Sequence, residues 1–291
     1  MEEIKDYRQI HTHQAWDKLY ARLKADDLVP AREARAKNNL VYYGLRIAAV
    51  ALILLGIGSV VYISMNGKPA VAMISLNTGN ETNTLVKTLA DGSVIYLSQN
   101  SLFSFPVEFT AASRNVELKG EAFFDIASNP EKPFIIETDE AFIQVLGTAF
   151  NVKTKHSDGF ELCVERGKVK VTLKSDPAHS EMVIAGEKIS AVNHSLVRSK
   201  YVAAAAGSWY KQRMRFKDEK LQNIISVLNR NFNTNFVLAN NETGNHKLTV
   251  TFENETAATM TGLICVALNL KSQTINGSVV LSEIREGAKP D

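Results

Sequence analysis

The sequence predicts a membrane-anchored, mainly β protein with one transmembrane helix, an all-β domain after it and a small α+β domain at the C-terminal end. Three observations predict this fold class. Residues 47–65 are apolar and uncharged, segments of alternating apolar residues follow as far as residue 191, and helical spacing returns only after Trp209. The length of 291 residues leaves room for two globular domains beside the membrane segment.

The composition narrows the class of protein. Hydrophobic residues make up 45% and charged residues 22% of the chain, as in ordinary folded proteins, so the membrane signal is local. The net charge is +2 and Lys and Arg do not cluster, so we expect no direct contact with nucleic acid. Cys163 and Cys265 lack the spacing of metal ligands and lie in different predicted domains. We therefore expect no metal, no cofactor and no disulfide framework.

Residues 1–44 form an arm before the membrane. Chains below about 40–50 residues usually need a metal, a disulfide or a partner to fold, so this arm has no core of its own. Four apolar residues fall at i, i+3, i+4 and i+7 of one predicted helix, namely Trp16, Leu19, Tyr20 and Leu23. Such a stripe suits the hydrophobic groove of a partner protein or the lipid of the inner leaflet, and the sequence leaves both open.

Residues 45–65 are assigned to the transmembrane helix. The run of about 19 uncharged residues would extend about 28 Å as a helix, close to the bilayer core of about 30 Å. A cleaved signal peptide is the rival interpretation, but a whole signal peptide has about 15–30 residues and the segment before this run is longer. Basic residues gather on the N-terminal flank, at Arg32, Arg35, Lys37 and Arg46. This predicts a single-pass protein of the inner membrane with a cytoplasmic N-terminus and a periplasmic C-terminal bulk.

Residues 66–202 are predicted to form the all-β domain. Asp91-Gly92 supplies the positive φ angles of a tight hairpin turn between two strands. The predicted strands cover residues 85–89, 94–97, 116–126, 134–138, 142–146, 150–154, 162–164, 169–173, 182–184 and 188–191. The pattern is typical of a sandwich, a barrel or a short solenoid, and the three stay open.

The charged residues of this domain do not predict an enzyme. Glu121 and Asp125 lie four apart on one strand face, which separates them by about 13 Å. The carboxylates of glycosidases lie about 5–9.5 Å apart. No phosphate-binding loop or nucleophile motif occurs either, so we expect no catalytic residue.

Residues 208–284 are predicted to form the second domain, after an alanine-rich linker. Its order is β-α-β-β-α-β-β, with two helices over one small sheet. Asp218 is the expected N-cap of the first helix, and Asn276-Gly277 predicts a tight hairpin turn. The buried stripe of the first helix is predicted at Leu221, Ile224, Ile225 and Leu228.

Several phrases of the all-β domain resemble one family. They cover residues 89–97, 101–106, 116–124, 132–134 and 145–152. As an ordered set they resemble the FecR-like family of transmembrane sigma-factor regulators. The second domain resembles the domain often attached to these proteins, which is similar to the short N-terminal signalling fold of secretins and TonB-dependent transporters (STN-like). Together the resemblance covers about residues 85–282.

The resemblance implies a cell-surface signalling chain. The signalling domain of a TonB-dependent outer-membrane transporter would contact the periplasmic part, and the arm would control an extracytoplasmic-function sigma factor, with regulatory proteases as a possible release step. The family-motif residues are expected to be structural, with Gly120 and Gly147 at bends or close backbone approaches and the phenylalanines in the core. These residues are Asp91, Gly92, Gly120, Glu121, Phe123, Phe124, Pro133, Phe134, Gly147, Thr148, Phe150 and Asn151.

The expected function is therefore that of an anti-sigma factor whose sigma-binding residues are Trp16, Leu19, Tyr20 and Leu23. Whether the arm inhibits or activates the sigma factor is open. The alternative is a membrane-anchored periplasmic carbohydrate-binding or scaffolding protein, which would need an exposed aromatic platform on the all-β domain.

Overall fold

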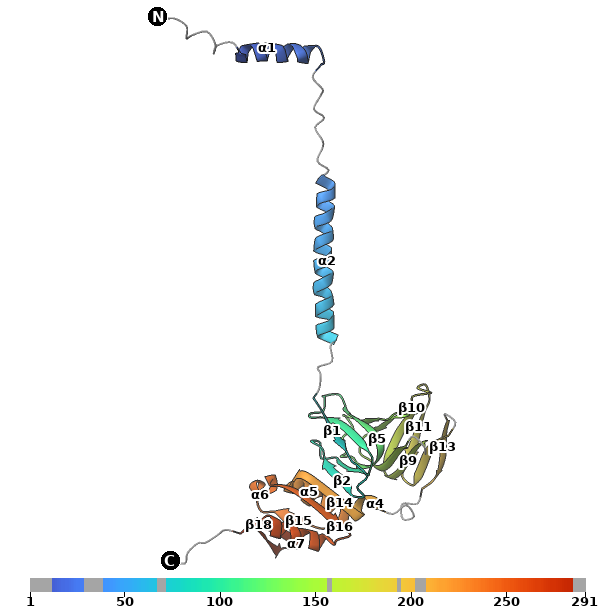
Figure 1. The fold of residues 1–291 in the computed structure, drawn as a ribbon. Coiled ribbons are helices and arrows are strands. Elements are labelled where there is room, and N and C mark those ends of the chain that lie inside the picture. The colour runs from blue at the N-terminus through green and yellow to red at the C-terminus, as the bar shows by residue number, and fades with distance from the viewer. Residues whose placement is uncertain are drawn as a thin grey trace, which may run out of the picture. The chain divides into compact units, whose positions relative to one another are not determined.

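The computed structural model describes residues 12–28, 39–66, 72–155, 159–192, 195–201 and 208–284. By its internal contacts the chain divides into two units, Met1–Pro69 and Ala70–Asp291. The described part of the first unit is helical, and the second unit contains all the described strands (Figure 1). Pro30 and the alanine-rich linker lie outside the described residues.

The first unit contains α1 (Thr12–Ala25) and α2 (Asn39–Asn66). The helix predicted from the spacing of Trp16 and Leu23 is thus confirmed, and residues 47–65 lie within the 28 residues of α2. Among the described residues of the chain, no helix is both long and apolar enough to cross a membrane.

The second unit begins with a β body of thirteen strands among its described residues. They are β1 (Met73–Asn77), β2 (Thr84–Thr88), β3 (Val94–Leu97), β4 (Leu102–Pro106), β5 (Arg114–Asp125), β6 (Phe134–Glu137), β7 (Ala141–Val145), β8 (Ala149–Lys155), β9 (Gly159–Arg166), β10 (Lys168–Leu173), β11 (Ser180–Ile184), β12 (Glu187–Val192) and β13 (Ser195–Lys200). Each strand predicted in this domain is present, while β1, β4 and β13 were not predicted.

The β body is a sandwich of two sheets that share β5. Residues 114–119 of β5 pair with β4 and β6, and residues 120–125 pair with β3 and β8. The first sheet has the order β1-β4-β5-β6-β7-β10-β11, and the second has β13-β12-β9-β8-β5-β3-β2. One apolar core lies between them and includes Phe103, Phe124, Phe134, Phe150 and Phe160, each at most 1% exposed. The sandwich is therefore the correct alternative among the three that the strand pattern allowed.

A C-terminal module follows the β body. It consists of α4 (Trp209–Gln212), β14 (Arg213–Lys220), α5 (Leu221–Phe232), β15 (Phe236–Leu238), α6 (Asn241–Asn245), β16 (Lys247–Glu253), α7 (Ala257–Ala267), β17 (Leu270–Ile275) and β18 (Ser278–Glu283). The predicted order of strands and long helices is confirmed, and α4 and α6 are short additions. The predicted stripe of α5 is also confirmed, since its four residues are at most 4% exposed.

Two predictions about this module are wrong. Its strands do not form one small sheet: β14 and β16 extend the second sheet of the β body, while β15, β18 and β17 form a separate one. The reason is that the edge of β2 is free to pair with β14 in parallel. Asp218 does not cap α5, because it lies at φ 49° in a bulge of β14, where its carboxylate pairs with Lys247 at 2.7 Å. The residue at the N-cap of α5 is Lys220.

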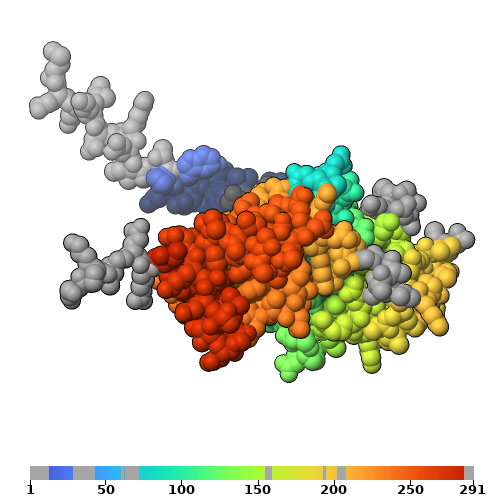
Figure 2. Space-filling view, turned by 90° about the horizontal axis from the view of Figure 1, so that it is seen from below, coloured from blue at the N-terminus to red at the C-terminus, as the bar shows by residue number. Residues whose placement is uncertain are grey.

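The β body and the module share a second apolar core. It combines Val86, Tyr96 and Phe123 from the outer face of the second sheet with Met214 of β14 and the buried stripe of α5. Figure 2 shows the module, in orange to red, continuous with the green-to-yellow β body. Because a sheet face with apolar side chains is stable only when covered, this core ties the two domains into one folded block.

Candidate functional site

The four sigma-binding residues predicted on α1 lie on one face of a helix that leaves them largely uncovered. Trp16 is 65%, Leu19 48% and Tyr20 58% exposed, and Leu23 is half-buried. We call these four residues the Trp16 stripe. The last turn of α1 is basic, with Arg22 and Lys24. The helix thus presents an apolar surface with positive charge beside it, a form that suits insertion into a groove.

The motif residues Asp91 and Gly92 form the hairpin turn between β2 and β3. Gly92 has φ +81°, as the turn requires. The carboxylate of Asp91 accepts hydrogen bonds from the amide of Ser93 at 3.0 Å and from its hydroxyl at 2.8 Å. It also forms an ion pair with the guanidinium of Arg114 at 2.7 Å. This turn is therefore held by a charge from a strand distant in sequence.

Arg114 is the largest fully buried side chain of the chain's described part, at 1% exposed, and sequence reasoning missed it. Its Nε donates to the carbonyl of Lys132 at 2.9 Å, and its guanidinium carbon lies 5.4 Å from the ring centroid of Phe134. The backbone amide of Arg114 donates to the carbonyl of Pro133. Asp91, Pro133 and Phe134 thus belong to one cluster around a buried cation. The sequence contained a signal for the burial of Arg114, because residues 114, 116 and 118 share the inward face of β5.

Gly120 and Gly147 lie where another backbone approaches closely. Gly120 has φ +104°, and a Cβ atom there would be 2.8 Å from Cα of Ser101. A Cβ atom at Gly147 would be 2.6 Å from Cα of Ser128. The neighbouring Thr148 donates its hydroxyl to the carbonyl of Lys168 at 2.9 Å. These positions accordingly have an architectural role, and Gly120 lies where β5 passes from one sheet to the other.

The remaining polar motif residues pair across the second sheet. Asn151 donates its side-chain amide to Glu121 at 3.1 Å. Asp125 instead forms ion pairs with Arg166 at 2.7 Å and with Arg230 of α5 at 3.0 Å. Glu121 and Asp125 therefore have separate partners, and Asp125 links the β body to the module.

The structure places Phe123 differently from the other motif phenylalanines. Phe124 and Phe150 stack inside the sandwich with ring centroids 5.3 Å apart. Phe123 points to the opposite face of the sheet and stacks on Tyr210, with centroids 3.8 Å apart and planes 6° apart. The expectation that it fills the core of the all-β domain is corrected, because neighbouring residues of a strand face opposite sides. Phe123 belongs to the apolar core that the β body shares with the module.

Burial raises the pKa of several ionisable groups in and near this shared core. Desolvation raises the pKa of the Tyr96 and Tyr210 phenols. Burial also raises the pKa of the Glu165 carboxyl, although the hydrogen bond from Tyr210 lowers it in part. Burial raises the pKa of the Cys163 thiol to about 12, so it is not a thiolate at neutral pH. Cys163 and Cys265 are both free.

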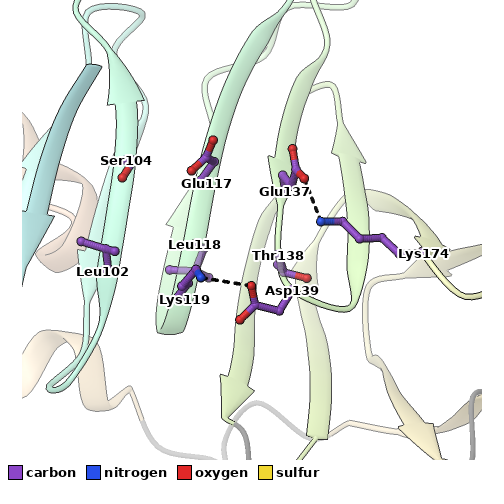
Figure 3. A pocket seen from close by; sticks show the side chains of 9 residues that line it. All are labelled: Leu102, Ser104, Glu117, Leu118, Lys119, Glu137, Thr138, Asp139 and Lys174. Atoms are coloured by element: carbon purple, nitrogen blue, oxygen red, sulfur yellow. Dashed lines mark hydrogen bonds and ion pairs between the residues drawn. The ribbon is translucent and has the colours of Figure 1, made fainter. Parts of the chain in front are cut away.

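A pocket of about 230 Å³ opens on the outer face of the first sheet (Figure 3). Four of its five charged side chains form two ion pairs, Lys119 with Asp139 at 3.3 Å and Lys174 with Glu137 at 2.7 Å; the fifth is Glu117. The hydroxyl of Ser104 is hydrogen-bonded to that of Ser75 at 2.9 Å. Among the described residues no group of three or more His, Cys, Asp or Glu side chains is placed to hold a metal ion.

Comparison with known proteins matches two family models to the second unit. Residues 75–170 match the FecR protein family and residues 213–281 match the FecR C-terminal family. No curated protein was found to match the sequence. One crystal structure of a candidate anti-sigma factor from Parabacteroides distasonis is 25% identical, with a TM-score of 0.45, over 74% of this chain and 100% of that one. Another, also of a candidate anti-sigma factor from that organism, is 26% identical, with a TM-score of 0.44, over 73% and 100%.

The two family matches together cover more than half of the chain and fall on the β body and on the module. They include every motif residue from which the resemblance was first drawn. The chain therefore belongs to the FecR family.

Proposed function

We propose that this FecR-family chain is an anti-sigma factor whose α1 binds an extracytoplasmic-function sigma factor through the Trp16 stripe. The observation that carries the proposal is the exposure of Trp16, Leu19 and Tyr20 on a helix with no core beneath them. Burying an aromatic or leucine side chain contributes about 1.5–3 kcal/mol, so four such residues can supply the affinity of a specific complex.

The charges of α1 favour a protein groove over a lipid surface. Lys18, Arg22 and Lys24 outnumber Asp17, so the helix is basic, but Asp17 is close to the stripe. An acidic rim around an apolar groove would attract Arg22 and Lys24 of the last turn, whereas anionic lipid would repel the carboxylate of Asp17. The sigma factor in this proposal therefore offers an apolar groove with acidic side chains at its edge.

The proposal places residues 45–65 across the inner membrane, with the arm in the cytoplasm and residues 66–284 in the periplasm. Its support is the uncharged run at residues 47–65 and the basic residues before it. Extraction of cell membranes at alkaline pH tests it. The chain should stay in the membrane pellet, and its release into the supernatant would contradict the anchor.

On the periplasmic side we propose that the signalling domain of a TonB-dependent outer-membrane transporter contacts the second unit. The apolar core shared by the β body and the module supports this, because a rigid block can pass a contact at one face to the segment that precedes β1. Regulated proteolysis is the proposed release step, and the likeness of the module to the STN-like fold stays a prediction.

Replacing Trp16 and Leu19 by alanine tests the role of the stripe in cells. Transcription from a promoter of the sigma factor should rise several-fold, because the arm no longer holds the sigma factor. The matched control is Gln14→Ala with Lys18→Ala, two exposed residues on the opposite face of α1, which should leave the reporter unchanged. A fall in the reporter would reverse the sign of regulation, and no change in either direction would refute binding by the stripe.

The alternative of a carbohydrate-binding or scaffolding protein has less support. A sugar platform needs several exposed aromatic rings, and in the described part of the β body Phe142 is the single aromatic residue among the exposed large hydrophobic side chains. The ammonium group of Lys174 lies 5.0 Å from the centroid of that ring. Stacking of a sugar on Phe142 would have to displace it.

A further inference from the structure

The helix α7 is unusual because it lacks a polar side. None of its eleven residues is charged. The residues on its inner side are buried in the module, namely Ala257, Met260, Thr261, Ile264 and Cys265. A helix on the surface of a small domain ordinarily turns charged and polar residues to water. The outward side of α7 has no charged residue, although it belongs to the surface of the module in Figure 2.

The outward side, which we call the α7 face, is formed by Ala258, Thr259, Gly262, Leu263 and Val266. Val266 is 84% exposed, more than any other exposed large hydrophobic residue of the described chain, and Leu263 is 49% exposed. Isolated exposed apolar residues are common. A continuous apolar helix face is typical of a surface that is covered in an assembly.

Burial of the α7 face would leave no side-chain hydroxyl without a partner. The hydroxyl of Thr259 is bonded to that of Thr256 at 2.9 Å, and Thr261 donates to the carbonyl of Ala257 at 2.8 Å. An unpaired polar group carries a large cost when it is buried, and α7 avoids this cost. The face is therefore suited to a dry contact.

Gly262 is the middle residue of α7. A Cβ atom at Gly262 would meet nothing within 4 Å, so another backbone has room to approach there. Ala258 lies four residues before Gly262 and Val266 four residues after it, each about 6 Å along the axis. In an antiparallel pair with a two-fold axis at Gly262, the protruding Val266 of each copy would lie over the small Ala258 of the other.

The charges beyond the ends of α7 select the same arrangement. Glu253 and Glu255 precede the helix, and Lys271 follows it. An antiparallel pair brings the acidic end of one copy to the basic end of the other, whereas a parallel pair sets like charges together. The helix dipoles are also opposed in the antiparallel pair, which is the favourable orientation.

From these observations we propose that the α7 face is a contact between two copies of this chain, packed antiparallel about Gly262. Eleven residues give a helix of about 16 Å, so the contact is smaller than the about 1,200 Å² of a stable interface. It is therefore weak for molecules free in solution and becomes populated where copies are concentrated, as on a shared membrane. The contact does not involve α1 and is independent of the function proposed for the Trp16 stripe.

Cysteine cross-linking of the full chain in cell membranes tests the contact. Gly262→Cys places two thiols at the two-fold axis, and mild oxidation should give a disulfide-linked dimer on a non-reducing gel. The wild-type chain is the background control, because Cys163 and Cys265 are buried. The matched control is Ala267→Cys, an exposed position about 140° around the same helix, which should give several-fold less dimer.

Two mixed variants test the register. Ala258→Cys and Val266→Cys chains carrying different tags should cross-link with each other and not with themselves, since residue 258 of the two copies would be about 12 Å apart along the axis. Adding Val266→Asp to the Gly262→Cys chain should lower the yield of disulfide-linked dimer to that of the Ala267→Cys control, with the circular dichroism spectrum unchanged.

The proposal is overturned if Gly262→Cys gives no more dimer than Ala267→Cys, or if Val266→Asp has no effect on it. Self-cross-linking of Ala258→Cys would also overturn it, because that result indicates a parallel pair. Capture of a different protein by Gly262→Cys in place of a second copy would assign the face to another partner and refute the two-fold contact.

Discussion

Replacing Asp91 by alanine should lower the free energy of unfolding of the second unit by about 3–5 kcal/mol, the cost of leaving a buried charge without its partner. Arg114 is 1% exposed and its ion pair with Asp91 is 2.7 Å long. The substitution also removes the acceptor of two hydrogen bonds from Ser93. Urea unfolding of the purified chain, followed by circular dichroism of the strands, measures the loss.

The control for this prediction is Asp139→Ala, which removes the same charge from the ion pair with Lys119. Both of those side chains are exposed, at 44% and 64%, so the expected loss is about 1 kcal/mol or less. Combining Asp91→Ala with Arg114→Met should recover part of the loss, because no buried charge is then left unpaired. If Asp91→Ala and Asp139→Ala lowered the free energy of unfolding equally, the buried charge of Arg114 would not need the carboxylate of Asp91.

Replacing Gly120 by alanine should destabilise the second unit by about 2–6 kcal/mol, from backbone strain and overpacking together. The residue has φ +104°, and the new Cβ atom would lie 2.4 Å from Oγ and 2.8 Å from Cα of Ser101. The Ser101 hydroxyl can rotate away, but its backbone is held in the sandwich by the bond between its carbonyl and Thr78 at 3.0 Å. The same urea measurement applies.

Gly79→Ala is the matched control for Gly120. It introduces the same methyl group at a position where nothing lies within 4 Å and where φ is not in the left-handed region. A change within about 0.5 kcal/mol is expected there. If Gly120→Ala were as mild as Gly79→Ala, β5 would not need a glycine to pass between the sheets.

Local sequence patterns were sufficient where a residue's neighbours along the chain determine its conformation. The hairpin turn at Asn276-Gly277 has φ angles of 50° and 81°, as its sequence predicts. The buried side of α5 follows from spacing alone, because a helix places residues three and four apart on one face. These features need no knowledge of the rest of the fold.

Features that depend on distant segments could not be predicted in this way. The strands β1 and β13 lie at sheet edges and are mostly exposed, so they lack the alternation that marks a half-buried strand. The pairing of β14 with β2 depends on a free edge that no local pattern reveals. Residues 122–124 did carry a signal, since consecutive apolar residues indicate a strand covered on both faces. Applied to Phe123, this signal predicts that its side chain lies in a second core.

The Trp16 stripe illustrates the same limit for function. The spacing of its residues predicts a helix, and the helix leaves three of them exposed, but the groove proposed to cover them would belong to another molecule. The chain belongs to the FecR family, and this membership does not by itself show which side chains contact a partner.

The central claim is that the stripe binds the sigma factor, and a titration tests it most directly. The purified full-length chain in detergent is titrated with the sigma factor, and the dissociation constant is compared for the wild type, the Trp16→Ala and Leu19→Ala double variant, and the Gln14→Ala and Lys18→Ala control. Loss of two buried side chains predicts affinity weaker by about 100-fold or more in the stripe variant, with the control like the wild type. Equal affinity of all three proteins would contradict the account.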